Sequence, residues 1–255
     1  VSGRGFDPTI GKLQKGGKDL PESELAELHT DIAFRQAIAT SLLCQNSNLN
    51  IIDDEWQSVG DPTDSACAVF GWKLKESVDS YRRSHPRFRE FTFDRKRKRM
   101  TTIHEFDGQR WAFSKGALGP FMGIATHIYE DGEVVKLEGR HKDRISEVNL
   151  EYASRALRVL ALCARRITDD IDIEDVEAVE QDMIFLGLVG IMDPPRPEVL
   201  DSISKCHAAG IRVTMITGDQ RMTAMAIGSE IGIVLEDSDH MSGKELRECT
   251  DEELQ

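Results

Sequence analysis

The pair Asp107-Gly108 stands between two segments of strand character, residues 100–106 and 111–114. Asp-Gly in this position is a strong signal for a β-hairpin. A third segment, residues 87–93, carries three phenylalanines and precedes the pair. Apolar residues at helical spacing come earlier in the chain, both before residue 44 and after Thr63. The first part of the chain is therefore predicted to be an α+β domain in which helices flank an antiparallel sheet.

The last third of the chain has a different pattern of apolar residues. Its continuous apolar run, residues 184–191, is typical of a strand that is buried on both faces. A helical segment, a second buried strand and a second helix follow, at residues 199–209, 212–216 and 222–231. This order predicts a βαβα unit of a parallel sheet. An acidic stretch at residues 168–180 separates the two patterns, so we expect one domain over residues 1–175 and part of another over residues 176–255.

The composition narrows the classes of function. Hydrophobic residues make up 40% of the 255 residues, and the longest apolar stretch, residues 183–192, is far shorter than the roughly 20 residues of a membrane-spanning helix. The net charge of −13 argues against nucleic acid as a partner, so an anionic ligand requires a local basic patch. The histidines show no ligand spacing, and no metal site is predicted within the chain. Because the sequence does not begin with Met, we expect it to come from a longer protein.

Two turns follow the strands predicted in the last third. One is Thr217-Gly218-Asp219 and the other begins at Asp193. Ligands of open α/β sheets bind at the carboxyl edge of the strands, where a helix N-terminus favours phosphate. Each turn taken alone is equally well a simple helix cap. Because both follow neighbouring strands of one unit, we expect them to face the same edge of the sheet.

A run of basic residues, residues 95–99, follows Phe93. If residues 94–97 form a four-residue loop, Phe93 and Lys98 become cross-strand neighbours. An aromatic ring beside an ammonium group suits a nucleotide, because the base stacks on the ring and the cation meets phosphate. The alternatives are that Phe93 belongs to the core and that the basic run is a solvated hairpin tip.

Three further positions are weaker candidates. Lys115-Gly116 ends the next strand, where a glycine lets a flat ligand approach the backbone, although such strand ends are common. Arg158 opens a strand and is either a phosphate contact or an ordinary exposed arginine. Asp64, at the start of a helix, either complements the helix dipole or accepts a hydrogen bond from an adenine amino group. The glycine-rich fingerprints of P-loop and dinucleotide-binding folds are absent from the sequence.

The order of these motifs is more specific than any one of them. The six segments are Gly60-Asp61-Pro62-Thr63-Asp64-Ser65-Ala66, residues 93–100, Lys115-Gly116-Ala117, Arg158-Val159-Leu160-Ala161-Leu162, Asp193-Pro194-Pro195-Arg196 and Met215-Ile216-Thr217-Gly218-Asp219. The series resembles the cytoplasmic part of type II P-type ATPases, the branch of the calcium and sodium/potassium pumps. The resemblance implies a nucleotide-binding domain followed by part of a phosphorylation domain of the haloacid-dehalogenase-like parallel α/β type.

The resemblance also implies roles in the first domain. Phe93 would stack on adenine, and Lys98 and Lys115 would line the ATP pocket. Gly116 would pack near the base, and Arg158 would contact the phosphates.

For the second domain the resemblance implies a part in phosphoryl transfer. Asp193 would be a hinge-side acid, and Thr217, Gly218 and Asp219 would hold the γ-phosphate and support Mg²⁺. Asp64 stands where the family usually has Glu, which weakens its expected contact with the adenine amino group.

Two segments of the family's pattern are missing from the chain. They are the Asp-Lys-Thr-Gly-Thr loop with the phosphorylated Asp and the Gly-Asp-Gly-x-Asn-Asp segment that completes the Mg²⁺ site. Leu118-Gly119 also replace the usual Pro-Glu after Lys-Gly-Ala. The chain is therefore expected to bind ATP without turning it over and to bind no transported cation.

The expected parent is a membrane enzyme that pumps a cation, with calcium as the first choice. Its transmembrane and actuator domains would be the partners of this chain, which would lie on the cytoplasmic side. Two alternatives remain open: a phosphatase of the haloacid dehalogenase type and a non-catalytic nucleotide-sensing module.

Overall fold

The structure is a computed structural model. It describes residues 8, 14–15, 18–21, 24, 28–52, 55–73, 77–155, 157–192, 197–217, 221–233 and 241–250. The chain divides into two compact units, one of Val1–Asn149 with Arg158–Met192, and one of Leu150–Leu157 with Asp193–Gln255. Among the helices that it describes, none combines the length and apolarity needed to span a bilayer.

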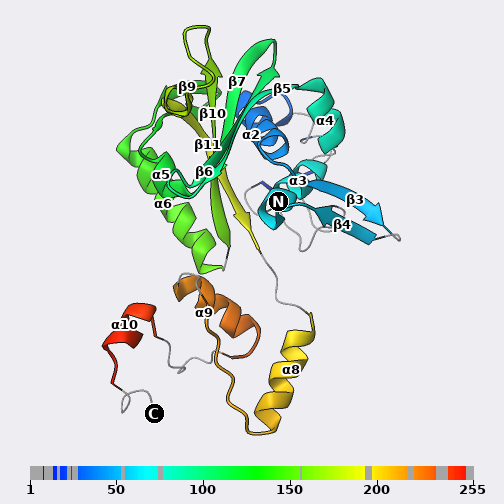
Figure 1. Ribbon diagram of the computed structural model, residues 1–255, viewed down its shortest axis with the longest axis vertical. Helices are drawn as coiled ribbons and strands as arrows, with labels where there is room; N and C mark the ends of the chain where they lie inside the picture. The colour runs from blue at the N-terminus through cyan, green and yellow to red at the C-terminus, as the bar shows by residue number, and fades with distance from the viewer. Residues whose placement is uncertain are drawn as a thin grey trace. The chain divides into compact units, whose positions relative to one another are not determined.

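A seven-stranded sheet forms the centre of the first unit, in the order β5-β6-β7-β10-β11-β8-β9 (Figure 1). Its strands are β5 (Arg87–Asp94), β6 (Arg99–Phe106), β7 (Gln109–Gly116), β8 (Ala125–Glu130), β9 (Glu133–Lys136), β10 (Arg158–Ile167) and β11 (Met183–Ile191). Neighbouring strands are antiparallel except β11 and β8, which are parallel. The predicted hairpin is confirmed: Asp107 and Gly108 turn β6 into β7, both with positive φ.

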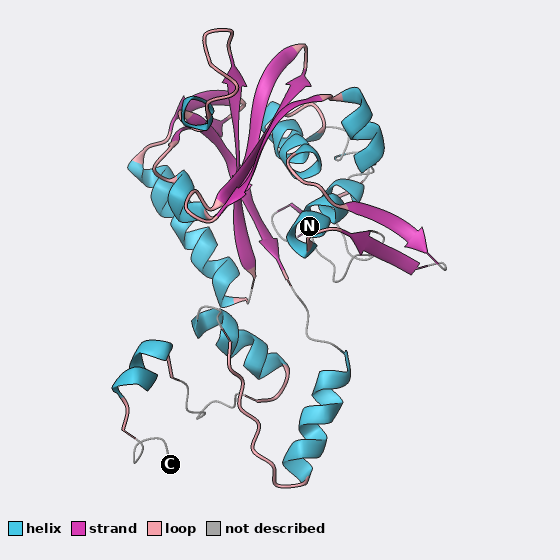
Figure 2. Cartoon of the chain, viewed as in Figure 1, coloured by secondary structure: helices cyan, strands magenta, loops and turns pink. Residues whose placement is uncertain are grey.

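Helices cover both faces of this sheet. They are α2 (Ile32–Leu43), α3 (Pro62–Lys73), α4 (Val78–Ser84), α5 (Leu118–Phe121), α6 (Gly139–Ser154) and α7 (Val176–Val179). On one face, Ala39 and Leu43 of α2 pack against Met100, Phe113 and Ala164. The other face is covered by α5, α6 and α7 through the buried side chains Phe121, Ile145 and Val179. Figure 2 shows this arrangement of helices around the strands.

A two-stranded hairpin lies beside α3. Its strands are β3 (Asn48–Ile52) and β4 (Glu55–Val59), and a second small sheet pairs β1 (Gln14–Lys15) with β2 (Lys18–Asp19). Gly60 links β4 to α3 with a φ of +129°, and a Cβ there would lie 2.2 Å from the Ser47 hydroxyl. Only glycine therefore fits this entry into α3.

The second unit contains α8 (Pro197–Ala208), α9 (Arg221–Glu230) and α10 (Gly243–Glu248). The strand expected over residues 212–216 is not formed: residues 211–217 are irregular, and Ile216 is 94% exposed. The apolar run 184–191 is a strand, as predicted, but its pairing was predicted wrongly. It is β11 and joins the first unit's sheet, antiparallel to β10. Within this run only Phe185 is buried, and the other residues are half-buried. An apolar run fits any inner position of a sheet covered by helices on both sides, so the pattern does not select the neighbours.

Candidate functional site

The start of α3 places the first candidate residue. The Asp61 side chain accepts hydrogen bonds from the backbone N–H groups of Thr63, at 2.8 Å, and Asp64, at 3.3 Å. With Pro62 as the first helical residue, this is a well-formed helix N-terminus. Asp64 therefore lies in the first turn, where a carboxylate is favoured by the helix dipole.

Asp64 and Lys115 form a buried ion pair. The Lys115 ammonium group donates to Asp64 Oδ1, and the backbone N–H of Asn46 donates to Asp64 Oδ2 at 2.8 Å. The two side chains are only 6% and 14% exposed. Burial alone lowers the pKa of Lys115, but the neighbouring Cys67, Cys44 and Asp64 raise it above its usual value. Burial raises the pKa of both thiols, so neither Cys44 nor Cys67 is charged at neutral pH.

Arg158 lies beside this pair. It is the first residue of β10, and its Nη1 atom is 3.5 Å from the Thr63 hydroxyl. Leu162 of the same strand is the direct neighbour of Lys115 on β7. The fold thus brings three predicted residues together at the start of α3, although they are far apart in the sequence.

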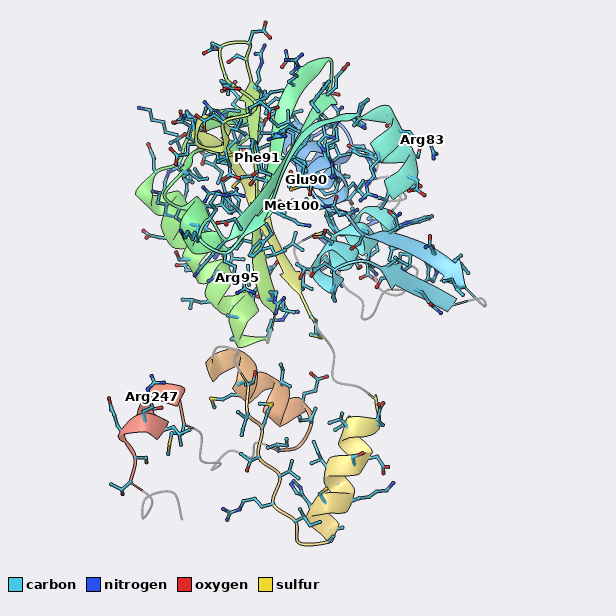
Figure 3. All side chains as sticks on the ribbon, in the orientation of Figure 1. Arg83, Glu90, Phe91, Arg95, Met100 and Arg247 are labelled. Atoms are coloured by element: carbon cyan, nitrogen blue, oxygen red, sulfur yellow. The ribbon has the colours of Figure 1, made fainter. Side chains whose placement is uncertain are left out.

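Phe93 and Lys98 lie on either side of Arg95, which belongs to the turn between β5 and β6 and is labelled in Figure 3. Phe93 is 62% exposed, so the alternative that it belongs to the core is wrong. The predicted pairing of Phe93 with Lys98 is also wrong: Asp94 pairs with Arg99, and Lys98 is the last residue of the turn, with a φ of +52°.

Asp94 explains why the turn starts one residue later than predicted. Its carboxylate accepts hydrogen bonds from the backbone N–H groups of Lys96, at 2.9 Å, and Arg97, at 2.8 Å. Its carbonyl accepts a further hydrogen bond from the Lys98 N–H at 2.6 Å. The hydrogen bond from the Arg97 N–H is the largest of the effects that lower the pKa of Asp94. An aspartate that closes a turn in this way belongs to the end of the strand.

Gly116 is the last residue of β7 and lies against Lys98 and Arg99. A Cβ at this position would lie 2.3 Å from the Lys98 carbonyl oxygen and 2.7 Å from Arg99 Cα. The Lys98 carbonyl also accepts a hydrogen bond from the Ala117 N–H at 3.0 Å. The glycine therefore lets the end of β7 touch the turn that carries Lys98, which gives Gly116 a structural role apart from any ligand.

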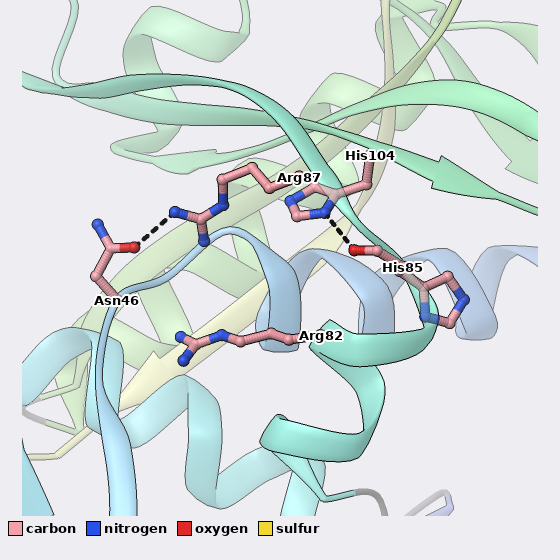
Figure 4. A pocket seen from close by; sticks show the side chains of 5 residues that line it. All are labelled: Asn46, Arg82, His85, Arg87 and His104. Atoms are coloured by element: carbon pink, nitrogen blue, oxygen red, sulfur yellow. Dashed lines mark hydrogen bonds between the residues drawn. The ribbon is translucent and has the colours of Figure 1, made fainter.

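A polar pocket of about 220 Å³ lies between α2, α4 and the sheet (Figure 4). It is lined by Asn46, Arg82, His85, Arg87 and His104. These residues are dispersed in the sequence, and no spacing signal could have identified them. Asn46 connects the pocket to the candidate site, because its backbone N–H binds Asp64.

The two arginines of this pocket hold the end of α2. Arg82 donates to the Gln45 carbonyl at 2.8 Å, and Arg87 donates to the carbonyls of Leu43, at 2.8 Å, and Gln45, at 3.0 Å. Their terminal nitrogens are therefore engaged by the protein itself, as expected for cations that satisfy the last carbonyls of a helix. His104 is 1% exposed, and burial lowers its pKa to about 4. We assign the pocket a structural role.

The candidates of the second unit are less fully described. Asp193, Gly218 and Asp219 lie outside the described residues. Thr217 is described as an exposed residue in irregular structure. Within the described part of the chain, no cluster of His, Cys, Asp or Glu side chains has an arrangement that could hold a metal ion.

The chain combines a mostly antiparallel sheet, flanking helices and a cluster of predicted residues at the start of α3. The sequence model of the family described as "P-type ATPase, cytoplasmic domain N" matches residues 33–198. The chain belongs to this family.

Individual relatives are calcium-transporting ATPases. The chain is 37% identical to "Calcium-transporting ATPase 1" of Bacillus cereus over 86% of its length, and 37% identical to "Calcium-transporting ATPase" of Bacillus subtilis over 100%. It is 28% identical over 99% of its length to "Calcium-transporting ATPase 4, endoplasmic reticulum-type" of Arabidopsis thaliana. These matches cover 24%, 28% and 26% of the three relatives, so the chain spans about a quarter of their length.

Proposed function

We propose that this chain binds ATP on the surface formed by Phe93, Lys98, Lys115, Asp64 and Arg158. The observation that carries the proposal is the exposure of Phe93 on the same sheet as Lys115, a lysine held in place by an ion pair. β5 and β7 lie on either side of β6, so about 10 Å separates their backbones. A nucleotide that stacks its base on Phe93 can reach both strands.

Each residue has a distinct task in this proposal. Phe93 stacks on the adenine ring, while Lys98 and Lys115 supply positive charge to an otherwise acidic protein. Gly116 keeps the base close to the backbone at the end of β7, and Arg158 contacts the phosphates. Asp64 already accepts two hydrogen bonds, but a carboxylate has about four acceptor sites, so the adenine amino group can still donate to it.

We further propose that residues of the second unit take part in phosphoryl transfer. Asp193 is the hinge-side acid, and Thr217, Gly218 and Asp219 hold the γ-phosphate and support Mg²⁺. The aspartyl-phosphate forms on a residue outside this chain, and further residues outside it complete the Mg²⁺ site and the haloacid-dehalogenase-like sheet. We place the boundary between the two domains after Met192, where the first compact unit ends, in place of the boundary at residues 175/176 predicted from the sequence. Phosphoryl transfer depends on positioning and charge stabilisation, which is what an ATP-holding domain provides.

For the intact protein we propose ATP-driven transport of a cation, calcium first, across a membrane. The names of the relatives support this proposal. The chain would face the cytoplasm and work with the transmembrane and actuator domains of the same protein. ATP-dependent uptake of calcium into vesicles that contain the intact protein would support it, and uptake of another cation instead would correct the choice of ion.

Calorimetric titration with ATP tests the nucleotide site of this chain. Replacing Phe93 with Ala is expected to raise the Kd about tenfold, since base–aromatic stacking contributes about 1–3 kcal/mol. Phe88→Ala is the matched control, because Phe88 lies on the same strand, is 45% exposed and packs beside Arg110. Equal Kd values for the two variants would contradict the proposal.

A phosphate-release assay tests whether the chain binds ATP without hydrolysing it. The purified chain is expected to bind ATP without releasing phosphate. Steady release that Asp219→Asn abolishes would show that the chain carries its own catalytic centre.

A further inference from the structure

Glu180 is a buried carboxylate that follows α7 and is 3% exposed. It accepts hydrogen bonds from three side chains. Arg97 Nη1 donates to Oε1, Arg99 Nε donates to Oε2 at 2.6 Å, and the Thr101 hydroxyl donates to Oε1 at 2.6 Å. All three donors come from the turn between β5 and β6 or from the start of β6, about 80 residues earlier in the sequence.

The same two arginines also donate hydrogen bonds to backbone carbonyls before the turn and within it. Arg97 Nη2 donates to the Thr92 carbonyl at 2.8 Å, and Arg99 Nη1 donates to the Arg97 carbonyl at 3.2 Å. Phe93 directly follows Thr92, and Lys98 lies between Arg97 and Arg99. Both proposed nucleotide contacts therefore lie next to backbone groups that this network holds.

Glu180 lies on the opposite face of the sheet from Lys115. Thr101 pairs with Ser114 across β6 and β7, and their hydroxyls are 2.7 Å apart. Met100 and Lys115, the adjacent residues in each strand, face α2 instead. Glu180 thus has no access to a nucleotide on the α3 side and can act on it only through the turn.

We propose that Glu180 is a positioning residue of the nucleotide-binding surface, which fixes the turn of residues 95–98 so that Phe93 and Lys98 are held ready for the ligand. Hydrogen bonds that involve charged groups are short and strong, and two of the three on this carboxylate come from guanidinium groups. Lys98 has a left-handed conformation, which a residue other than glycine keeps only where its surroundings hold it. Fixing a binding segment in advance lowers the entropy that binding must overcome. The inference rests on the proposed ATP site.

Glu180→Gln tests this role, because it keeps the shape of the side chain and removes its charge. The Kd for ATP is expected to rise about tenfold, which corresponds to about 1.4 kcal/mol. Glu180→Asp keeps the charge and is expected to recover at least part of this loss. Each variant is titrated at a temperature where circular dichroism shows it to be fully folded.

Ile145→Ala is the control for lost stability alone. Ile145 lies in α6, is 6% exposed and packs on the sheet far along the strand order from β5. Its truncation destabilises the same unit without touching the turn, so the Kd of this variant is expected to stay unchanged. A Kd that rises equally in Ile145→Ala and Glu180→Gln would overturn the positioning role.

Amide hydrogen exchange without nucleotide gives the second readout. The Lys98 N–H donates to the Asp94 carbonyl, and its exchange is expected to accelerate in Glu180→Gln but not in Ile145→Ala. Unchanged exchange in Glu180→Gln, or an unchanged Kd, would overturn this inference while leaving the ATP site intact. A wild-type chain that binds no ATP would overturn the proposed function and this inference with it.

Discussion

The two halves of the proposed nucleotide surface differ sharply in their burial. The half at α3 consists of Asp64 and Lys115, whose paired side chains are 14% and 6% exposed. The half at the β5–β6 turn carries Phe93, which is 62% exposed, and Lys98, which is also exposed. The first half is part of the folded interior, whereas the second half contributes little to it. Substitutions in the two halves should therefore separate stability from ligand binding.

Lys115→Met should have the largest effect on stability. It leaves the Asp64 carboxylate buried without its partner, and removing one member of a buried ion pair costs about 3–5 kcal/mol. Urea unfolding measures this loss. Arg35→Ala, at the more exposed pair of Arg35 and Asp107, is the control and should cost less than about 1 kcal/mol. Equal losses in both variants would remove the distinction between the halves.

Acid should have the next largest effect on stability, through His104 of the neighbouring polar pocket. His104 has a pKa of about 4 in the folded chain because it is buried, against about 6.5 when unfolded. Between these values only the unfolded chain takes up the proton, so stability falls as the pH drops from 6.5 to 4. The total loss is up to about 3 kcal/mol.

Urea unfolding at pH 7 and at pH 4.5 measures this dependence, with His104→Gln as the comparison. The variant should lose less stability on acidification than the wild type. The same loss in both proteins would assign the acid sensitivity to other groups.

Gly116→Ala should affect both halves. The added Cβ would lie 2.3 Å from the Lys98 carbonyl oxygen, so the turn must shift. Overpacking of this kind costs about 1–3 kcal/mol. Gly119→Ala is the matched control, because open space surrounds that glycine. The Kd for ATP should rise together with the loss of stability, and a variant that unfolds and binds like the wild type would show that Gly116 does not join the halves.

Phe93→Ala should have the smallest effect on stability. An exposed side chain away from the core changes the free energy of unfolding by about 0.5 kcal/mol or less. Thermal and urea unfolding should therefore give nearly wild-type curves for the variant that is expected to lose ATP binding. A large shift of the unfolding midpoint would mean that Phe93 supports the fold.

Local signals in the sequence predicted most of the first unit. The Asp107-Gly108 hairpin and the strand at residues 184–191 are confirmed. The neighbours of that strand were not predictable, because an apolar pattern does not record which strands pair with it, here β10 and β8. The register of the β5–β6 turn was missed by one residue, because it depends on the hydrogen bonds of the Asp94 side chain.

The site was predictable only in part, for a related reason. Asp64 and Lys115 were both chosen from the sequence, yet their pairing across 51 residues is a property of the fold. Glu180 was read as part of an acidic boundary segment, where a carboxylate is expected to be solvated. Its burial depends on Arg97 and Arg99, which pair with it from the β5–β6 turn and the start of β6. These residues are about 80 positions away in the sequence.

A ¹H–¹⁵N NMR titration of the wild-type chain with ATP tests the central claim most directly. The account predicts saturable shifts of the amides of Phe93, Lys98 and Gly116, with little change at Arg82 and His104 in the neighbouring pocket. Shifts centred on Arg82 and His104, or no saturable shifts at all, would contradict it.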